Sequence, residues 1–182
     1  MADYVEDDDA YPVMVELVAT VQQQLIKNGL TPIDKATVQP GGTIVNDYAG
    51  SGKECGELIV NLISAYPSNP FPQQAQTGSR AGKASIGCGV IIAYSLAVTI
   101  LRCAPNMRGT KAAPTPPTLN DQLMAARDQM ADMKAMRMAI CQAMNNTGRD
   151  YQLGVYTPVG AEGGVVGGTW GVLVAEHDGF SN

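Results

Sequence analysis

A short segment near residue 50 has some of the residues of a phosphate-binding loop. Residues 50–53 read Gly-Ser-Gly-Lys, and a glycine-lysine pair is part of the loop that surrounds nucleotide phosphates. The complete loop also has a glycine five positions before that glycine, and a serine or threonine after the lysine. Those positions hold Asp47 and Glu54, so an acid would stand beside the phosphates and magnesium would lack its hydroxyl ligand. We interpret the segment as a solvated turn, and a small cytoplasmic enzyme with its site at the Lys53 loop is the alternative.

The other reactive side chains do not form a recognisable catalytic or metal-binding group. His177 is the only histidine, and it lies beside Asp178 in a polar stretch where a solvated imidazole is expected. The four cysteines are dispersed and include no Cys-x-x-Cys pair, which argues against zinc: Cys55, Cys88, Cys103 and Cys141. We therefore expect no catalytic residue, no metal and no cofactor. The cysteines are interpreted as thiols in a reducing cytoplasm, with a disulfide as the alternative.

Composition and charge argue against nucleic-acid and membrane partners. The net charge is −5, and the 12 basic residues are scattered, whereas a duplex-binding protein usually has a basic face. The uncharged segment 84–101 alternates large with small side chains, which indicates a buried strand more than a membrane helix. Only 16% of residues are charged, below the typical value of about 25%, so we expect a protein partner to cover part of the surface.

The chain is predicted to form a single domain at 12–175, between an acidic mobile arm at 1–11 and a polar tail at 176–182. Apolar residues at helical spacing predict a helix from Pro12 to Gly29. Thr118 and Asp121 form a capping-box pattern for a second, methionine-rich helix that extends to about Asn145. Its apolar stripe, which we expect to face the core, contains Leu123, Ala126, Met130, Met133, Met136, Ile140 and Met144. Met138 lies off that stripe and is a candidate partner contact.

Between and after the helices, short alternating segments predict strands at 33–38, 43–46, 57–66, 90–102, 153–156 and 169–174. Segment 57–66 is apolar on both faces apart from Asn61, which indicates a central strand or a subunit contact. In 90–102 the large residues should pack on the helices. The small face could meet another sheet or a neighbouring subunit through Ala93, Ser95, Ala97 and Thr99. This predicts an α+β fold with a mixed, mostly antiparallel sheet and both helices packed on it.

Two irregular segments interrupt these elements. Residues 105–117 are interpreted as a linker, and glycines between 160 and 168 as turns. A long polar loop is predicted at 67–84, and loops of this length are usually functional or disordered. Its one aromatic residue and its two cations are the candidate contacts with a partner: Phe71, Arg80 and Lys83.

The order of these elements and several short motifs resemble the tail terminators of long-tailed bacteriophages, in the style of phages that infect actinobacteria. The resemblance covers most of 12–175, and its weight lies in the order of the motifs. These are Cys55-Gly56, Ser64-Ala65-Tyr66-Pro67-Ser68, Phe71-Pro72-Gln73, Cys88-Gly89, Ala93-Tyr94-Ser95-Leu96, Arg102-Cys103-Ala104-Pro105, the helical segment 129–137, Tyr156-Thr157-Pro158-Val159-Gly160 and Gly167-Gly168-Thr169-Trp170.

This resemblance implies a structural protein of the virion, assembled in the host cytoplasm. It implies a homo-oligomer, a six-fold ring, whose partners are the tail tube protein and the head-completion or stopper protein. DNA would pass through the ring without specific binding, and the family supplies no catalytic residues. A head-closure, stopper or adaptor ring of the same phage neck is the closest alternative.

The interpretation of segment 50–53 is tested by nucleotide binding. Because Asp47 and Glu54 replace the required glycine and hydroxyl residue, we expect calorimetry with ATP and magnesium to detect no binding. A micromolar affinity that is lost in Lys53→Ala would contradict this expectation and favour the enzyme alternative.

Overall fold

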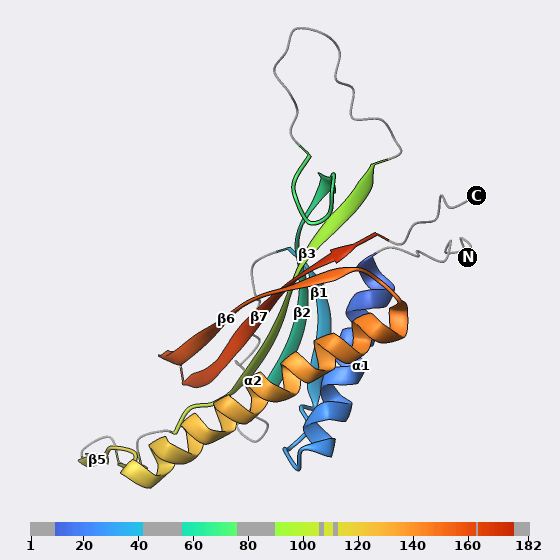
Figure 1. Cartoon of the computed structure of the whole chain (residues 1–182). Helices are drawn as coiled ribbons and strands as arrows, with labels where there is room; N and C mark the ends of the chain where they lie inside the picture. The colour runs from blue at the N-terminus through green and yellow to red at the C-terminus, as the bar shows by residue number, and fades with distance from the viewer. Residues whose placement is uncertain are drawn as a thin grey trace, which may run out of the picture.

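The computed structural model describes residues 10–41, 56–75, 90–105, 108–110, 113–162 and 164–176. These residues form two helices, a five-stranded mixed sheet and a separate two-stranded sheet (Figure 1). The elements are α1 (Ala10–Lys27), β1 (Lys35–Pro40), β2 (Gly56–Ser68), β3 (Ile91–Cys103), β4 (Arg108–Thr110), β5 (Ala113–Thr115), α2 (Leu119–Thr147), β6 (Tyr151–Glu162) and β7 (Val165–Ala175). The predicted α+β fold is therefore confirmed.

Local sequence signals determine where the helices begin and end. The Thr118 hydroxyl accepts a hydrogen bond from the Asp121 backbone N–H at 3.2 Å, and the Asp121 carboxylate accepts one from the Thr118 N–H at 3.0 Å. This capping box satisfies amide groups that the first turn of α2 would leave unpaired. Gly148, with φ of 63°, ends α2, and Gly29, with φ of 69°, follows the end of α1. Both predicted helices are thus present, and α1 begins two residues earlier than Pro12.

The large sheet has the order β1-β2-β3-β7-β6, and β1 with β2 is the only parallel pair among its described strands. β2 lies between β1 and β3, which confirms the central position predicted from its two apolar faces. Leu58, Ile59 and Val60 are each 0% exposed, so both faces of β2 are buried over this part of the strand. The predicted strand 43–46 lies outside the described residues.

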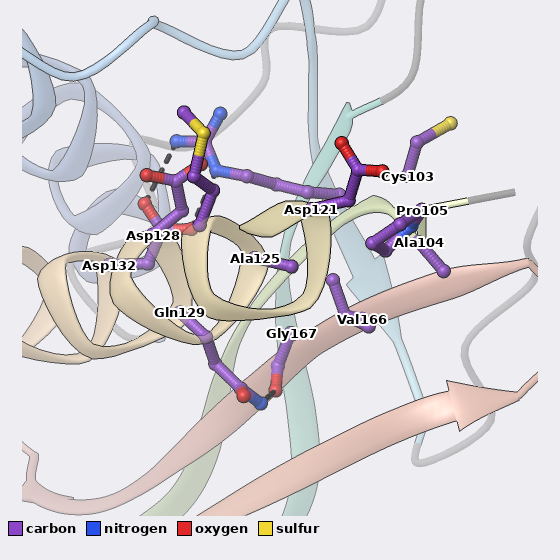
Figure 2. Close-up of a pocket in the computed structure, with 12 residues that line it drawn as sticks. Cys103, Ala104, Pro105, Asp121, Ala125, Asp128, Gln129, Asp132, Val166 and Gly167 are labelled. Atoms are coloured by element: carbon purple, nitrogen blue, oxygen red, sulfur yellow. Dashed lines mark hydrogen bonds and ion pairs between the residues drawn. The ribbon is translucent and has the colours of Figure 1, made fainter. Parts of the chain in front are cut away.

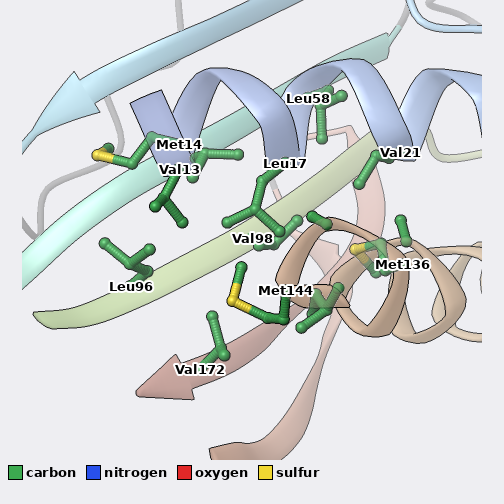
Figure 3. Packing of buried hydrophobic residues seen from close by; sticks show 14 of the residues in the cluster. Val13, Met14, Leu17, Val21, Leu58, Leu96, Val98, Met136, Met144 and Val172 are labelled. Carbon is green, nitrogen blue, oxygen red and sulfur yellow. The ribbon is translucent and has the colours of Figure 1, made fainter. Parts of the chain in front are cut away.

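Both helices pack on the same face of the sheet (Figure 1), and the hydrophobic core lies between them and that face. Figure 3 shows Leu17 and Val21 of α1 and Met136 and Met144 of α2 over the strands. The large residues of β3 point into this layer, as predicted from the alternation in its sequence. They are Tyr94, Leu96, Val98 and Ile100.

The final hairpin is longer than predicted. β6 and β7 extend well beyond 153–156 and 169–174, so Gly160, Gly167 and Gly168 lie within strands, and the prediction that they form turns is wrong. A Cβ on Gly167 would overlap the carbonyl oxygen of Ile100, and a Cβ on Gly168 would overlap the Tyr156 ring. These two glycines allow neighbouring groups to approach β7 closely. Glycine often has this role inside a strand.

Other irregular segments also contain more structure than expected. The predicted linker 105–117 includes the paired strands β4 and β5. At the start of the predicted loop 67–84, β2 continues to Ser68, and residues 69–75 form a hydrogen-bonded turn. Residues 1–9, 42–55, 76–89 and 177–182 lie outside the described residues. Neither of the two described helices has the length and apolarity needed to cross a bilayer.

Two valines at different depths test this packing. Val98 is buried in the central strand β3, whereas Val155 in the edge strand β6 is 79% exposed. We expect Val98→Ala to lower the free energy of unfolding by about 2–3 kcal/mol, because it removes buried methyl groups and leaves a cavity. Val155→Ala, the matched control, should change it by less than about 1 kcal/mol in urea unfolding. Equal losses would contradict this description of the core.

Candidate assembly surface

A pocket of about 260 Å³ lies where α2 passes the ends of β3 and β7. Figure 2 shows the side of α2 that faces it, with Asp121, Asp128 and Asp132 from the helix and Val166 and Gly167 from β7. Three aspartates on one helix would repel one another in a closed cavity. The pocket is open on one side, and an arginine from β3 lies within it.

The Arg102 side chain forms a two-pronged ion pair with Asp132. Its Nε donates to Asp132 Oδ2 at 2.6 Å and its Nη2 donates to Asp132 Oδ1 at 2.8 Å. Nη2 also donates to the Thr31 carbonyl oxygen at 3.1 Å. The Asp132 side chain is only 2% exposed, so both carboxylate oxygens are paired with Arg102 in a buried position. The hydrogen bond to Asp132 raises the pKa of Arg102, and the charges of Asp132 and Asp128 add to the effect.

A second cluster next to the ion pair joins α2 to the β6–β7 hairpin. Gln129 Nε2 donates to the carbonyl oxygens of Val159 and Gly167, and Trp170 Nε1 donates to the Met133 carbonyl oxygen at 3.0 Å. The rings of Tyr156 and Trp170 lie 5.5 Å apart between centroids. Burial raises the pKa of the Tyr156 phenol, as does the charge of Asp132, so the hydroxyl stays neutral at ordinary pH. These contacts hold α2 firmly from Gln129 onward.

Several polar groups of this region make structural contacts. Arg102 is bonded to Asp132 and to the backbone, and its neighbour Cys103 is disulfide-bonded. Within the part of the chain that the structure describes, no three histidine, cysteine, aspartate or glutamate side chains are placed to hold a metal ion. The arrangement can lock the helix to the sheet.

The disulfide at Cys103 corrects one sequence interpretation. The four cysteines were expected to be thiols, yet Cys103 is disulfide-bonded, and among the described cysteines Cys141 is a free thiol. Dispersed cysteines far apart in a sequence give no measure of their distance in space, so the sequence could not decide between the two states.

The N-terminal half of α2 passes over the ends of β3 and β7 with one side and exposes its other side. There, Leu119, Leu123 and Met130 are 72%, 60% and 62% exposed. Leu123, Ala126 and Met130 belong to the stripe that was predicted to face the core, and that part of the prediction is wrong. The core-facing side of these turns instead carries Ala125 and Gln129. The predicted stripe is half-buried at Met133 and becomes buried only from Met136.

Helix α1 also has apolar residues on a solvent-facing side. Tyr11, Val15 and Ile26 are exposed, and Val18 between them is half-buried. The residues are spaced so that they share one side of the helix, whereas Leu17 and Val21 face the core. Sequence analysis missed this second side, although the spacing of 11, 15, 18 and 26 could have indicated it.

The residues that were predicted to contact a partner differ in their exposure to solvent. Ala93 and Thr99 have no exposed surface, and the Thr99 hydroxyl lies 2.8 Å from that of Thr169. Ser95 and Ala97 are half-buried, Met138 is exposed, and Phe71 is half-buried in the turn after β2. Arg80, Lys83 and the Lys53 loop lie outside the described residues. Within the described set, the exposed helical residues offer more apolar surface to a partner than the small face of β3.

No protein-family model and no curated protein sequence matches this chain.

The ion pair gives a direct test of the region. Asp132→Asn should lower the free energy of unfolding by about 3 kcal/mol, because it leaves the Arg102 charge without its buried partner. The control Asp128→Asn removes an exposed carboxylate on the same helix and should shift it by about 0.5 kcal/mol or less. Urea unfolding monitored by circular dichroism measures both. Similar midpoints for the two variants would show that the pair does not anchor α2.

Proposed function

We propose that this chain is a structural subunit of a phage virion, which forms a ring that terminates the tail tube and joins it to the neck proteins. The observation that carries the proposal is the set of large exposed apolar side chains on the N-terminal half of α2. Exposing such side chains to water costs free energy. A group of them on the surface of a folded domain is typical of a protein interaction surface.

The order of elements agrees with the resemblance stated from the sequence. An N-terminal helix, a strand block, a long helix and a closing strand pair occur in the predicted order. The two helices cover one face of the sheet, and no described helix covers the other, so the domain has several faces that neighbours could use. These features support an assembling subunit and are compatible with a head-closure, stopper or adaptor ring as the alternative.

The proposal predicts a closed ring that binds tail tubes. We expect size-exclusion chromatography with light scattering to give a multimeric mass for the purified chain, and negative-stain images to show six-fold rings. Rings added to polymerised tail tube protein should bind at tube ends and stop elongation. A chain that remains monomeric even with tail tube protein would overturn the proposal. Rings that bind only the head-completion protein would favour the stopper alternative.

A further inference from the structure

We propose that the disulfide at Cys103 is a redox-sensitive lock on the anchor of α2. In the oxidised state the cross-link holds the last residue of β3 in place, and Arg102 beside it keeps its pair with Asp132. Reduction releases the end of the strand and weakens that pair. The lock is a property of the single subunit, and only its use in the life of a virion rests on the proposed function.

Cys103 is the residue at which the chain leaves the large sheet. It is the last residue of β3 and pairs with Val165 of β7, and the next amide, that of Ala104, donates to the Gly164 carbonyl oxygen at 2.8 Å. The following strands, β4 and β5, form a separate two-stranded sheet. Strand ends open more easily than strand centres, because fewer contacts hold them. A covalent bond at Cys103 therefore acts at a place where the sheet is prone to open.

Arg102, the residue before Cys103, makes the contact that depends on this strand end. Its side chain pairs with both carboxylate oxygens of Asp132 and also reaches the Thr31 carbonyl oxygen at 3.1 Å. Pairing through two nitrogens requires a fixed orientation between the guanidinium and the carboxylate, so a backbone shift at the strand end weakens it. The Asp132 side chain, 2% exposed, has little water to replace a lost partner. Opening at the end of β3 is thereby transmitted to α2.

The sulfur of Cys103 lies where a small thiol can reach it. Neighbouring residues of a strand point to opposite faces, so Arg102 points toward the helices and Cys103 points away from them. Figure 2 shows the Cys103 sulfur directed away from α2. Cys103 is half-buried and lines the open pocket between α2 and the ends of β3 and β7. Disulfides that solvent can reach exchange with thiols more readily than buried ones.

The switch operates by exchange with a dithiol. One thiolate of the dithiol attacks a disulfide sulfur, and its second sulfur then closes a ring and leaves two protein thiols. Two electrons and two protons pass from the dithiol to the protein, and a small oxidised disulfide reverses the reaction. A cytoplasm keeps thiols reduced, whereas the surroundings of a released virion are oxidising. The thiol expected from the sequence and the disulfide in the structure are then two states of the same residue.

Hydrogen exchange measured by mass spectrometry tests the lock in the purified full-length chain, with and without reduced dithiothreitol. We expect reduction to speed exchange at residues 129–136, which include the anchor, by at least about tenfold. Residues 139–144 of the same helix, which pack in the core, should change less. Equal exchange with and without dithiothreitol would overturn the proposal. An equal increase in both segments would overturn it too, because it would show only a general loss of stability.

Two cysteine variants are matched controls. Cys103→Ser should exchange like the reduced wild type and should not respond to dithiothreitol. Cys141→Ser removes a free thiol of α2 and should respond like the wild type. A response to dithiothreitol that persists in Cys103→Ser would contradict the lock.

Asp132→Asn gives an independent test that does not require Cys103→Ser to fold. Its anchor is already broken, so dithiothreitol should change exchange at residues 129–136 far less than in the wild type. The control Asp128→Asn keeps the anchor and should respond fully. A full response in Asp132→Asn would show that the disulfide does not act through the ion pair, and would overturn the proposal.

These results separate the lock from the proposed function. A chain that caps tail tubes but whose exchange ignores dithiothreitol would overturn the lock and leave the ring function standing. A chain that shows the lock but never binds tail tubes would support the lock and overturn the tail-terminator function.

Discussion

The ion pair between Arg102 and Asp132 is the contact on which the arrangement of the elements depends. One guanidinium group binds a carboxylate of α2 with two nitrogens and also reaches the carbonyl oxygen of Thr31, in the segment after α1. Because Arg102 lies at the end of β3, three separate parts of the chain meet at a single side chain. Breaking the pair would leave a charge in a mostly buried place, which costs more than the loss of an exposed ion pair.

The position of this contact also divides α2 into two parts with different environments. After Asp132 the helix buries small and large apolar residues against α1 and the sheet, including Ala135, Ala139 and Ile140. Before it, the inward side carries Ala125 and Gln129, and the large apolar residues turn outward. The firm anchoring of one half is what allows the other half to present an apolar surface in a fixed direction, where a flexible segment would lose entropy on binding.

Signals between neighbouring residues made the helices and strands predictable from the sequence. Features that depend on contacts between separate elements could not be predicted in this way. The capping residues Thr118 and Asp121, the alternation in β3 and the two-sided apolar sequence of β2 depend on neighbours in the chain, and each was interpreted correctly. Helical periodicity placed Leu123 and Met130 on the same stripe as Ile140, but periodicity carries no information on where the sheet ends. The roles of Gly167 and Gly168 likewise depend on Ile100 and Tyr156, residues far away in sequence.

The crossing of α1 and α2 has a consequence for the geometry of any assembly these helices build. Gln24 Nε2 of α1 donates to Gln142 Oε1 of α2 at 2.7 Å, and apolar side chains of both helices interlock around that bond. A molecule that contacted both helices would therefore meet two surfaces whose relative orientation this packing fixes. That orientation is set in the core of a single domain, where packing tolerates little adjustment.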